Sequence, residues 1–275
     1  EKLPKFLGAA DYLTLLNNIS IQDTGQERYS RDLINKYRTG YDPELYPDVN
    51  WIDAITKDYA HNTRATLDLS GGNERLRYSV VAAYYNESGI TETDKRQNYN
   101  SNLTVNRFNL RTNVDMNVTP TTLLNVNVGG YLQTRNAPKE GIDDVFSAAF
   151  KATPFAVPTI YENGMIPKPR ENENPWAKLT QSGFYREGRS KLESLFSVEQ
   201  DLHCITDGLK AKVIFSYDYY SRNGVDRGKA PRYYYPATQR DPVTGELQTI
   251  VLQEGDEFLG YNRWEEYGNY STYLE

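Results

Sequence analysis

Glu265 and Glu266 are the residues that most directly suggest catalysis, because glycoside hydrolysis uses a pair of carboxyl groups. Such a pair must face one bond across a separation of roughly 5 to 9.5 Å. The surrounding residues indicate a strand, in which adjacent side chains point to opposite faces, so the pair is poorly placed. The sequence also contains no G-x-S-x-G motif, no P-loop and no G-x-G-x-x-G motif. We therefore expect no enzymatic activity.

Metal-binding side chains are scarce. The chain has one cysteine, Cys204, and two histidines, His61 and His203. A single cysteine excludes an internal disulfide and a cysteine-based zinc site. No carboxylate spacing typical of a metal site replaces them, so we expect neither a metal nor a cofactor.

Aromatic residues in irregular stretches are the best candidates for ligand contact, because loops carry much of the binding chemistry of proteins. These candidates are Trp176 in "ENENPWAKL", Tyr233, Tyr234 and Tyr235 in "APRYYYP", and Trp264 in "YNRWEEY". Their rings could stack on sugars while neighbouring amides and carboxylates bind the hydroxyls. Packing within the loops, or contact with a protein partner, explains the same residues equally well.

The elements that must position these loops are strands. In "RFNLRTNVDMNV" (107–118), apolar or methyl-bearing side chains occupy every second position from Phe108 to Val118. A period of two predicts a strand with one apolar and one polar face. The same alternation predicts strands at 64–70, 75–85, 123–133, 191–202, 209–220 and, less clearly, 266–275. Two environments produce it: a soluble sandwich, or a membrane barrel with apolar side chains outward.

The lengths of the loops distinguish the soluble sandwich from the membrane barrel. The connections "GGNE", "TPTT" and "HCITDG" are short, and they alternate with long loops at 86–106, 134–190 and 222–264. In an up-and-down sheet, all the short turns then fall at one end, as in outer-membrane barrels. Several strands also reach the roughly 9 to 11 residues that span a bilayer. Tyr84, Tyr217 and Tyr219 are expected toward the long-loop ends, where an aromatic girdle would lie.

Composition is compatible with this interpretation. Tyrosine is abundant, with 23 residues, and suits interfaces between apolar and aqueous surroundings. The net charge is −6 and the basic residues are dispersed, which argues against a nucleic-acid partner. No apolar stretch is long enough for a transmembrane helix. The polar strand faces would line the lumen, with Arg107, Arg111, Asp115, Glu193 and Glu199 as candidates, although a solvated wall without a ligand role is the simpler interpretation.

Residues 1–60 differ from the rest. "FLGAADYLTLLNNI" has apolar residues at helical spacing, and "RYSRDLINKYRTG" predicts a second short helix ending at Gly40. A turn and one helical turn follow in "YDPELYPDVNWIDAI". We interpret 1–60 as a connecting region and 61–275 as the sheet. A further helix is expected at 141–154, in the longest loop, with Asp143 and Asp144 near its start.

Three stretches resemble a known family. "YPDVNWIDAI", "LDLSGGNERLRYSVVAAYYNESGI" and "RFNLRTNVDMNVTPTTLLNVNVGGY" are similar to the early barrel of SusC/RagA-type TonB-dependent transporters. There, a tyrosine-proline-to-tryptophan segment precedes the first strands and a Ser-Gly-Gly turn joins strands one and two. "DYLTLLNNI" resembles the stretch between plug and barrel. The resemblance is dense over 1–135 and weaker beyond.

The resemblance implies an all-β fold: about seven antiparallel transmembrane strands of a plugged barrel of about 22 strands, with short helices at the N-terminus and in one long loop. It implies import of glycans or oligopeptides through the outer membrane of a Gram-negative cell. The implied partners are a SusD-like surface lipoprotein, membrane lipid and the TonB energy-coupling complex. A signal peptide, TonB box and plug are missing from the sequence, so we expect a segment that does not transport alone.

The alternative is a soluble β-sandwich that binds carbohydrate through its aromatic loops. It predicts a lone domain that folds without detergent. The transporter segment predicts aggregation of the lone segment in water and a gene that continues on both sides, with a plug upstream and roughly fifteen more alternating strands downstream.

Overall fold

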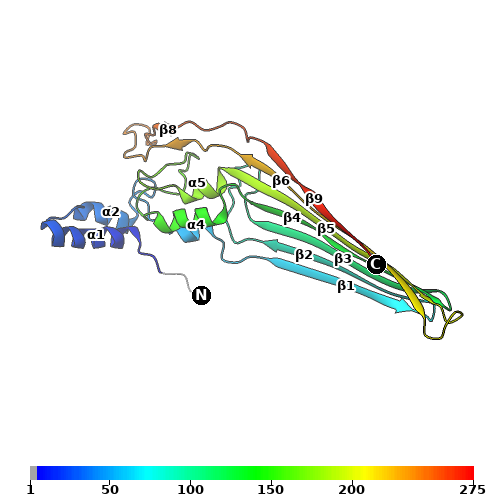
Figure 1. Cartoon of the computed structure of the whole chain (residues 1–275). Helices are drawn as coiled ribbons and strands as arrows, with labels where there is room; N and C mark the ends of the chain where they lie inside the picture. The colour runs from blue at the N-terminus through cyan, green and yellow to red at the C-terminus, as the bar shows by residue number, and fades with distance from the viewer. Residues whose placement is uncertain (1–4) are drawn as a thin grey trace.

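The computed structural model describes residues 5–275, apart from the side chain of residue 267. Seven strands form one antiparallel sheet in the order β1-β2-β3-β4-β5-β6-β9, so that each strand pairs with its neighbours in sequence (Figure 1). The strands are β1 (Asn62–Gly72), β2 (Leu76–Ser88), β3 (Thr104–Thr119), β4 (Thr122–Pro138), β5 (Gly183–Asp201), β6 (Lys210–Gly228) and β9 (Asn262–Leu274). The seven expected strands are confirmed, and the described sheet is not closed.

Several strands are longer than the sequence pattern indicates. β5 and β6 each have 19 residues and extend toward the long-loop end of the sheet. The added residues 183–190 and 221–228 are largely polar, so they carry no apolar alternation that could reveal a strand. Pairing across the two strands continues without a break from Gly183–Gly228 to Asp201–Lys210.

Connections are sorted by length, as the sequence predicts. The turns 73–75, 120–121 and 202–209 lie at one end of the sheet. The loops 89–103, 139–182 and 229–261 lie at the other, together with the N-terminal helices (Figure 1). These loops are shorter than the predicted ranges because their flanking strands are longer.

Three helices precede the sheet: α1 (Ala9–Thr24), α2 (Arg31–Thr39) and α3 (Trp51–Ile55). The Ser30 hydroxyl accepts a hydrogen bond from the Leu33 amide and caps α2, which ends at Gly40 in the left-handed conformation (φ 61°). Glycine adopts that conformation at little cost. No described helix has the length and apolarity needed to cross a membrane.

The long loops have secondary structure of their own. The expected helix in loop 139–182 is α4 (Ile142–Lys151), and a second helix, α5 (Pro175–Thr180), was not anticipated. Asn174 is fully buried and caps α5, because its side chain accepts a hydrogen bond from the Ala177 amide. Loop 229–261 contains a small hairpin of β7 (Tyr233–Tyr234) and β8 (Val251–Gln253).

The buried core lies at the long-loop end and not on the sheet. In the largest cluster, Trp51, Ile52 and Ile55 of α3 pack against Val145 of α4 and Leu179 of α5. A second cluster joins α1 to α2, and a third joins Ile166 and Ala177 to Tyr233. We call α1–α3 with loops 139–182 and 229–261 the cap. Apart from Ala137, at the end of β4, every buried apolar residue in the described range belongs to the cap.

Candidate functional site

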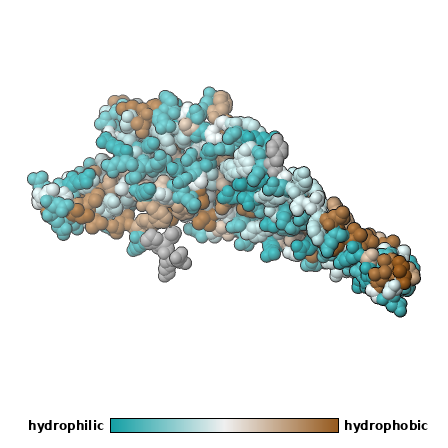
Figure 2. Space-filling model, viewed as in Figure 1, coloured by the Kyte–Doolittle hydropathy of each residue, from teal (hydrophilic) through white to brown (hydrophobic). Residues whose placement is uncertain are grey.

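One face of the sheet is apolar and uncovered. Strand register places Leu67, Ala82, Leu110, Gly130, Leu192, Tyr219 and Tyr270 in one row across all seven strands. The following apolar residues of this face are each more than half exposed: Leu67, Leu69, Phe108, Leu110, Val118, Leu132 and Val213. Apolar side chains are visible toward the turn end of the sheet in Figure 2. A contiguous apolar surface of this kind marks contact with another apolar phase.

The apolar band has a limited height. On β3 it runs from Phe108 to Val118, about ten residue steps of about 3.3 Å each, or roughly 33 Å along the strand. At a tilt of about 40°, this corresponds to roughly 25 Å, the height of the apolar band of outer-membrane barrels. On the same face beyond Phe108, the next row toward the long loops is polar, with Asn86, Asn106 and Thr134.

Three tyrosines lie in the long-loop half of this band. Tyr84 lies in its last row toward the long loops, with its ring 4.8 Å from that of Phe108, and its hydroxyl donates a hydrogen bond to Asn106. Tyr219 and Tyr217 lie in the next two rows, level with Leu110 and Thr112, and so in the long-loop half of the band. They lie near the middle of β6 itself, because that strand continues to Gly228.

The opposite face is polar. Arg107, Arg111, Asp115, Glu193 and Glu199 all lie on it, since the register pairs Arg111 with Gly129 and Gly129 with Glu193. Hydrogen bonds run across its strands: Asn125 donates to Asp115 at 2.8 Å, and Ser197 donates to Asn125 at 3.1 Å. The Arg107 guanidinium lies 4.0 Å from the centre of the Tyr131 ring. These contacts join polar side chains of neighbouring strands.

A buried carboxylate on this face was not anticipated. Glu187 is 2% exposed and pairs with Arg189 and Arg222. Arg222 also lies 5.0 Å from the centre of the Trp264 ring, which stacks on Tyr185 at 6.4 Å. Glu187 falls within the long loop expected at 134–190, because charges on both faces of β5 conceal the strand at this point.

The five candidate aromatic residues are not brought together. Trp176 packs against the α3–α4 cluster, and Tyr233 is 6% exposed in the third cluster, where burial raises the pKa of its phenol. Trp264 lies in β9, outside the loop. Tyr234 is half-buried in β7. Tyr235 is the one exposed residue of the three neighbouring tyrosines, with 48% of its surface accessible.

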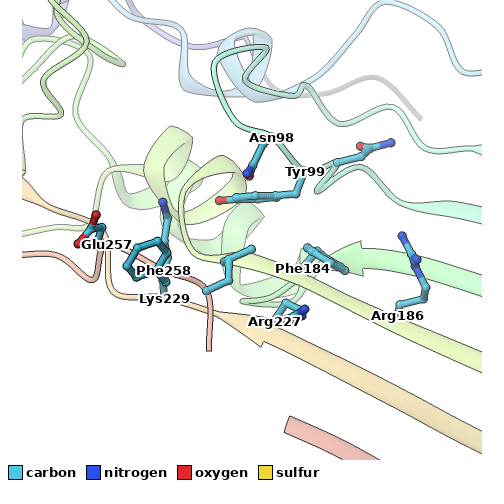
Figure 3. Close-up of a pocket in the computed structure, with 10 residues that line it drawn as sticks. Asn98, Tyr99, Phe184, Arg186, Arg227, Lys229, Glu257 and Phe258 are labelled. Atoms are coloured by element: carbon cyan, nitrogen blue, oxygen red, sulfur yellow. The ribbon is translucent and has the colours of Figure 1, made fainter. Parts of the chain in front are cut away.

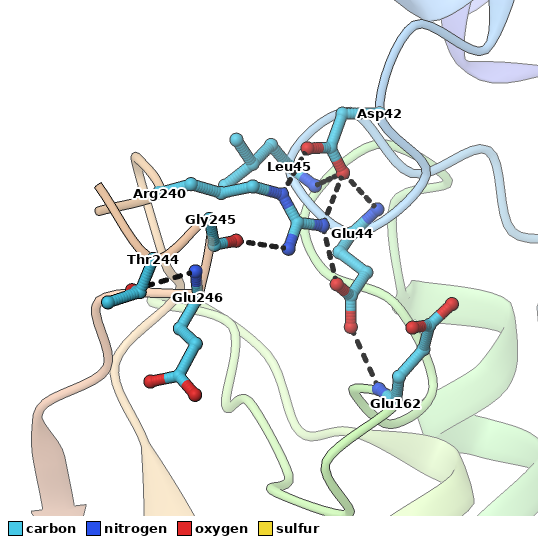
Figure 4. Close-up of polar contacts among 8 residues, drawn as sticks. All are labelled: Asp42, Glu44, Leu45, Glu162, Arg240, Thr244, Gly245 and Glu246. Carbon is cyan, nitrogen blue, oxygen red and sulfur yellow. Dashed lines mark hydrogen bonds and ion pairs between the residues drawn. The ribbon is translucent and has the colours of Figure 1, made fainter. Parts of the chain in front are cut away.

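An ion-pair network fastens the cap (Figure 4). Arg240 donates through Nε to Asp42 at 2.6 Å and through Nη2 to Glu44 at 2.6 Å. Glu44 also accepts a hydrogen bond from the Glu162 amide at 2.8 Å. The network therefore joins the N-terminal segment to loops 139–182 and 229–261. The hydrogen bonds from Arg240 hold the pKa of Asp42 below its usual value, although burial opposes this shift.

A pocket of about 530 Å³ lies where loop 89–103 meets the ends of β5 and β6 (Figure 3). Its walls include Tyr99, Phe184, Arg186, Arg227 and Lys229. The Tyr99 hydroxyl donates a hydrogen bond to the Thr180 carbonyl at 2.8 Å, which anchors the loop to α5. Burial raises the pKa of Tyr99 to about 12, so its phenol is neutral at pH 7.

Comparison with known proteins gives structural matches alone. The chain matches no protein-family model and no curated protein. A solved structure of the RagAB peptide transporter aligns over 99% of this chain with a TM-score of 0.41 and 12% identity, and the RagAB peptide importer in the closed-closed state gives 0.40 and 12%. The chain spans 38% and 37% of the lengths of those chains.

Proposed function

We propose that this sheet is a wall segment of an outer-membrane barrel through which large nutrients, glycans or oligopeptides, are imported. The observation that carries the proposal is a single sheet whose apolar face, roughly 25 Å high, is left uncovered by the described chain. A soluble sandwich would bury this face under a second sheet. The only other sheet among the described residues is the small β7–β8 hairpin in the cap.

The edges of the sheet support a larger assembly. All residues of β1 are exposed, and the outer edge of β9 pairs with no described strand. Unpaired backbone groups are too costly in hydrocarbon for an open sheet to span a bilayer. Further strands beside β1 and β9 would close the barrel, with Arg107, Arg111, Asp115, Glu193 and Glu199 toward its lumen.

The remaining parts follow from the resemblance of residues 1–135 to SusC/RagA-type transporters. The cap would face the cell exterior, where a SusD-like surface lipoprotein would contact it. The helices within 1–60 would lead from a plug to the first barrel strand. Energy would come from the TonB complex acting on that plug. Within the cap, Tyr235 would be the aromatic residue best exposed to cargo or partner.

Cysteine scanning along β3 tests the membrane orientation. Because Cys204 is the only cysteine, a C204S background allows single cysteines at 108, 110, 112 and 114, with 109, 111, 113 and 115 as matched positions on the other face. In membranes that hold the barrel closed by its further strands, the even positions should react with a lipid-soluble reagent and the odd positions with a water-soluble maleimide. Equal labelling of both sets would contradict the proposal.

A further inference from the structure

The pocket of Figure 3 combines cations with aromatic rings. Phe184 and Arg186 of β5 have the same parity as Leu192, so they lie on the apolar face of the sheet. Arg227 of β6 pairs with Phe184 and shares that face. The pocket therefore opens on the outward side of the sheet and not on the polar side.

The distance to the apolar band is short. Ser190 marks the last row of the band on β5, in register with Leu132 and Ser221. Arg186 lies four residues beyond it, about 13 Å along the strand and about 10 Å in height after tilt. An extended arginine side chain can lower its charged group by several ångströms toward an interface. The Arg186 guanidinium is thus within reach of the layer directly above the hydrocarbon. Arg227, in register with Phe184 six residues beyond Ser190, starts about 15 Å above the band.

The cations of the pocket lack carboxylate partners. Within residues 5–275, neither Arg186, Arg227 nor Lys229 forms a salt bridge. Aromatic rings hold the two guanidinium groups instead: Arg186 lies 5.5 Å from the centre of the Phe184 ring, and Arg227 lies 4.8 Å from that of Tyr261. Glu257 is the single acidic residue in the wall, so the pocket has an excess of positive charge.

We infer that this pocket binds a phosphate-bearing lipid headgroup of the outer leaflet, with Arg186, Arg227 and Lys229 as the phosphate ligands. Guanidinium groups bind phosphate oxygens in pairs of parallel hydrogen bonds, and a lysine adds a point charge. The rings of Tyr99 and Phe184, 5.8 Å apart, form an apolar wall against the headgroup. The inference rests on the proposed membrane location and adds a specific lipid contact to it.

A binding experiment on the full chain in mild detergent tests this inference. The probe is lipid A, in its phosphorylated and its enzymatically dephosphorylated forms. The double variant R186Q/R227Q should bind phosphorylated lipid A about tenfold or more weakly than the unmodified chain, on the order expected from the loss of two basic contacts. Dephosphorylated lipid A should bind both proteins equally weakly. The matched control R64Q/R77Q removes the same charge from the opposite face and should bind phosphorylated lipid A normally.

Three outcomes would overturn the inference. Equal affinity for the two forms of lipid A would show that phosphate is not recognised. Equal loss in R64Q/R77Q would show a general charge effect. Full displacement of lipid A by millimolar inorganic phosphate would assign the pocket to free phosphate instead.

Membrane insertion separates this inference from the proposed function. R186Q/R227Q should still give alternating labelling along β3. Alternating labelling without phosphate selectivity would contradict the lipid site but would still support the proposed barrel segment. Equal labelling of both faces of β3 in the unmodified protein, in membranes that hold the closed barrel, would contradict both.

Discussion

Arg240 contacts Asp42, which lies 198 positions earlier in the sequence, with the guanidinium Nε 2.6 Å from one carboxylate oxygen and Nη2 3.1 Å from the other. This paired contact ties loop 229–261 to the segment that precedes α3. Hydrogen bonds to a charged partner contribute about 1.5–3 kcal/mol, and partial exposure of Arg240 reduces this value.

Replacing Arg240 with glutamine should therefore loosen loop 229–261. We expect a cost of about 1 kcal/mol in local stability, which is about a fivefold faster amide exchange in that loop, measured by hydrogen–deuterium exchange. Arg232→Gln is the matched control, since Arg232 pairs with the exposed Glu254. A similar change in the control would contradict a specific role for Arg240.

Acid should release the same loop. The pKa of Asp42 is lower in the folded chain than its usual value of 3.8, so its contribution to docking is complete above that value. The contribution is lost as pH falls through the lowered folded pKa. Exchange in loop 229–261 should thus accelerate below about pH 3.8, and Asp42→Asn should remove this pH step. If the pH step were unchanged in Asp42→Asn, the step would belong to another carboxylate.

Lysine substitutions along β3 should report depth in the membrane. Leu110→Lys places a charge within the apolar band and should cost about 2–4 kcal/mol in the free energy of unfolding from bilayers. Asn106→Lys, on the same face above the band, should cost about 0–1 kcal/mol. Asn109→Lys on the polar face is the control. Equal costs at 106 and 110 would argue against a bilayer around this face.

Gly130 and Gly129 provide a neighbouring pair for testing the sheet. A Cβ at Gly130 would collide with the Lys191 carbonyl of β5, whereas a Cβ at Gly129 would meet the Leu110 carbonyl at an ordinary 3.6 Å. Gly130→Ala should destabilise the β4–β5 pairing by about 1–3 kcal/mol, and Gly129→Ala by less than about 0.5 kcal/mol, in denaturant unfolding. An equal loss of stability in the two variants would contradict the close approach of β4 and β5 at Gly130.

Alanine substitutions at Tyr233 and Tyr235 should distinguish a role in packing from a role in binding. Tyr233→Ala removes a buried ring and should lower cap stability by about 2–4 kcal/mol, measured by thermal unfolding of the cap. Tyr235→Ala should leave the midpoint unchanged and, if the exposed ring contacts cargo or partner, weaken binding of oligosaccharide or peptide. Loss of stability in Tyr235→Ala would argue for packing alone.

Periodicity revealed the strands where the two faces differ in chemistry. β3 was recognisable because apolar and polar residues alternate from Arg107 to Val118. The outer parts of β5 and β6 were missed, because Arg186 and Arg189 place charge on opposite faces and remove the alternation. Helix α5 was missed because six residues give no helical period.

The pocket was beyond sequence reasoning for a topological reason. Tyr99, Phe184 and Lys229 come from three segments that meet only after β4, β5 and β6 have paired. The ring of Tyr99 belongs to a loop whose anchor, the Thr180 carbonyl, lies 81 positions away. Among the candidate aromatic residues, the sequence could not distinguish the buried Tyr233 from the exposed Tyr235, because the two tyrosines stand two positions apart in one irregular stretch.

The contact between Asp42 and Arg240 also sets an order of assembly. Helices α1–α3 emerge early during synthesis, but the arginine that fastens them is made 198 residues later. Contacts this distant in sequence form slowly, because a long loop must close first. During that interval Trp51, Ile52 and Ile55 have neither α4 nor α5 to cover them. The N-terminal half of the cap therefore stays incomplete until loops 139–182 and 229–261 are in place, and it must be shielded from aggregation during that interval.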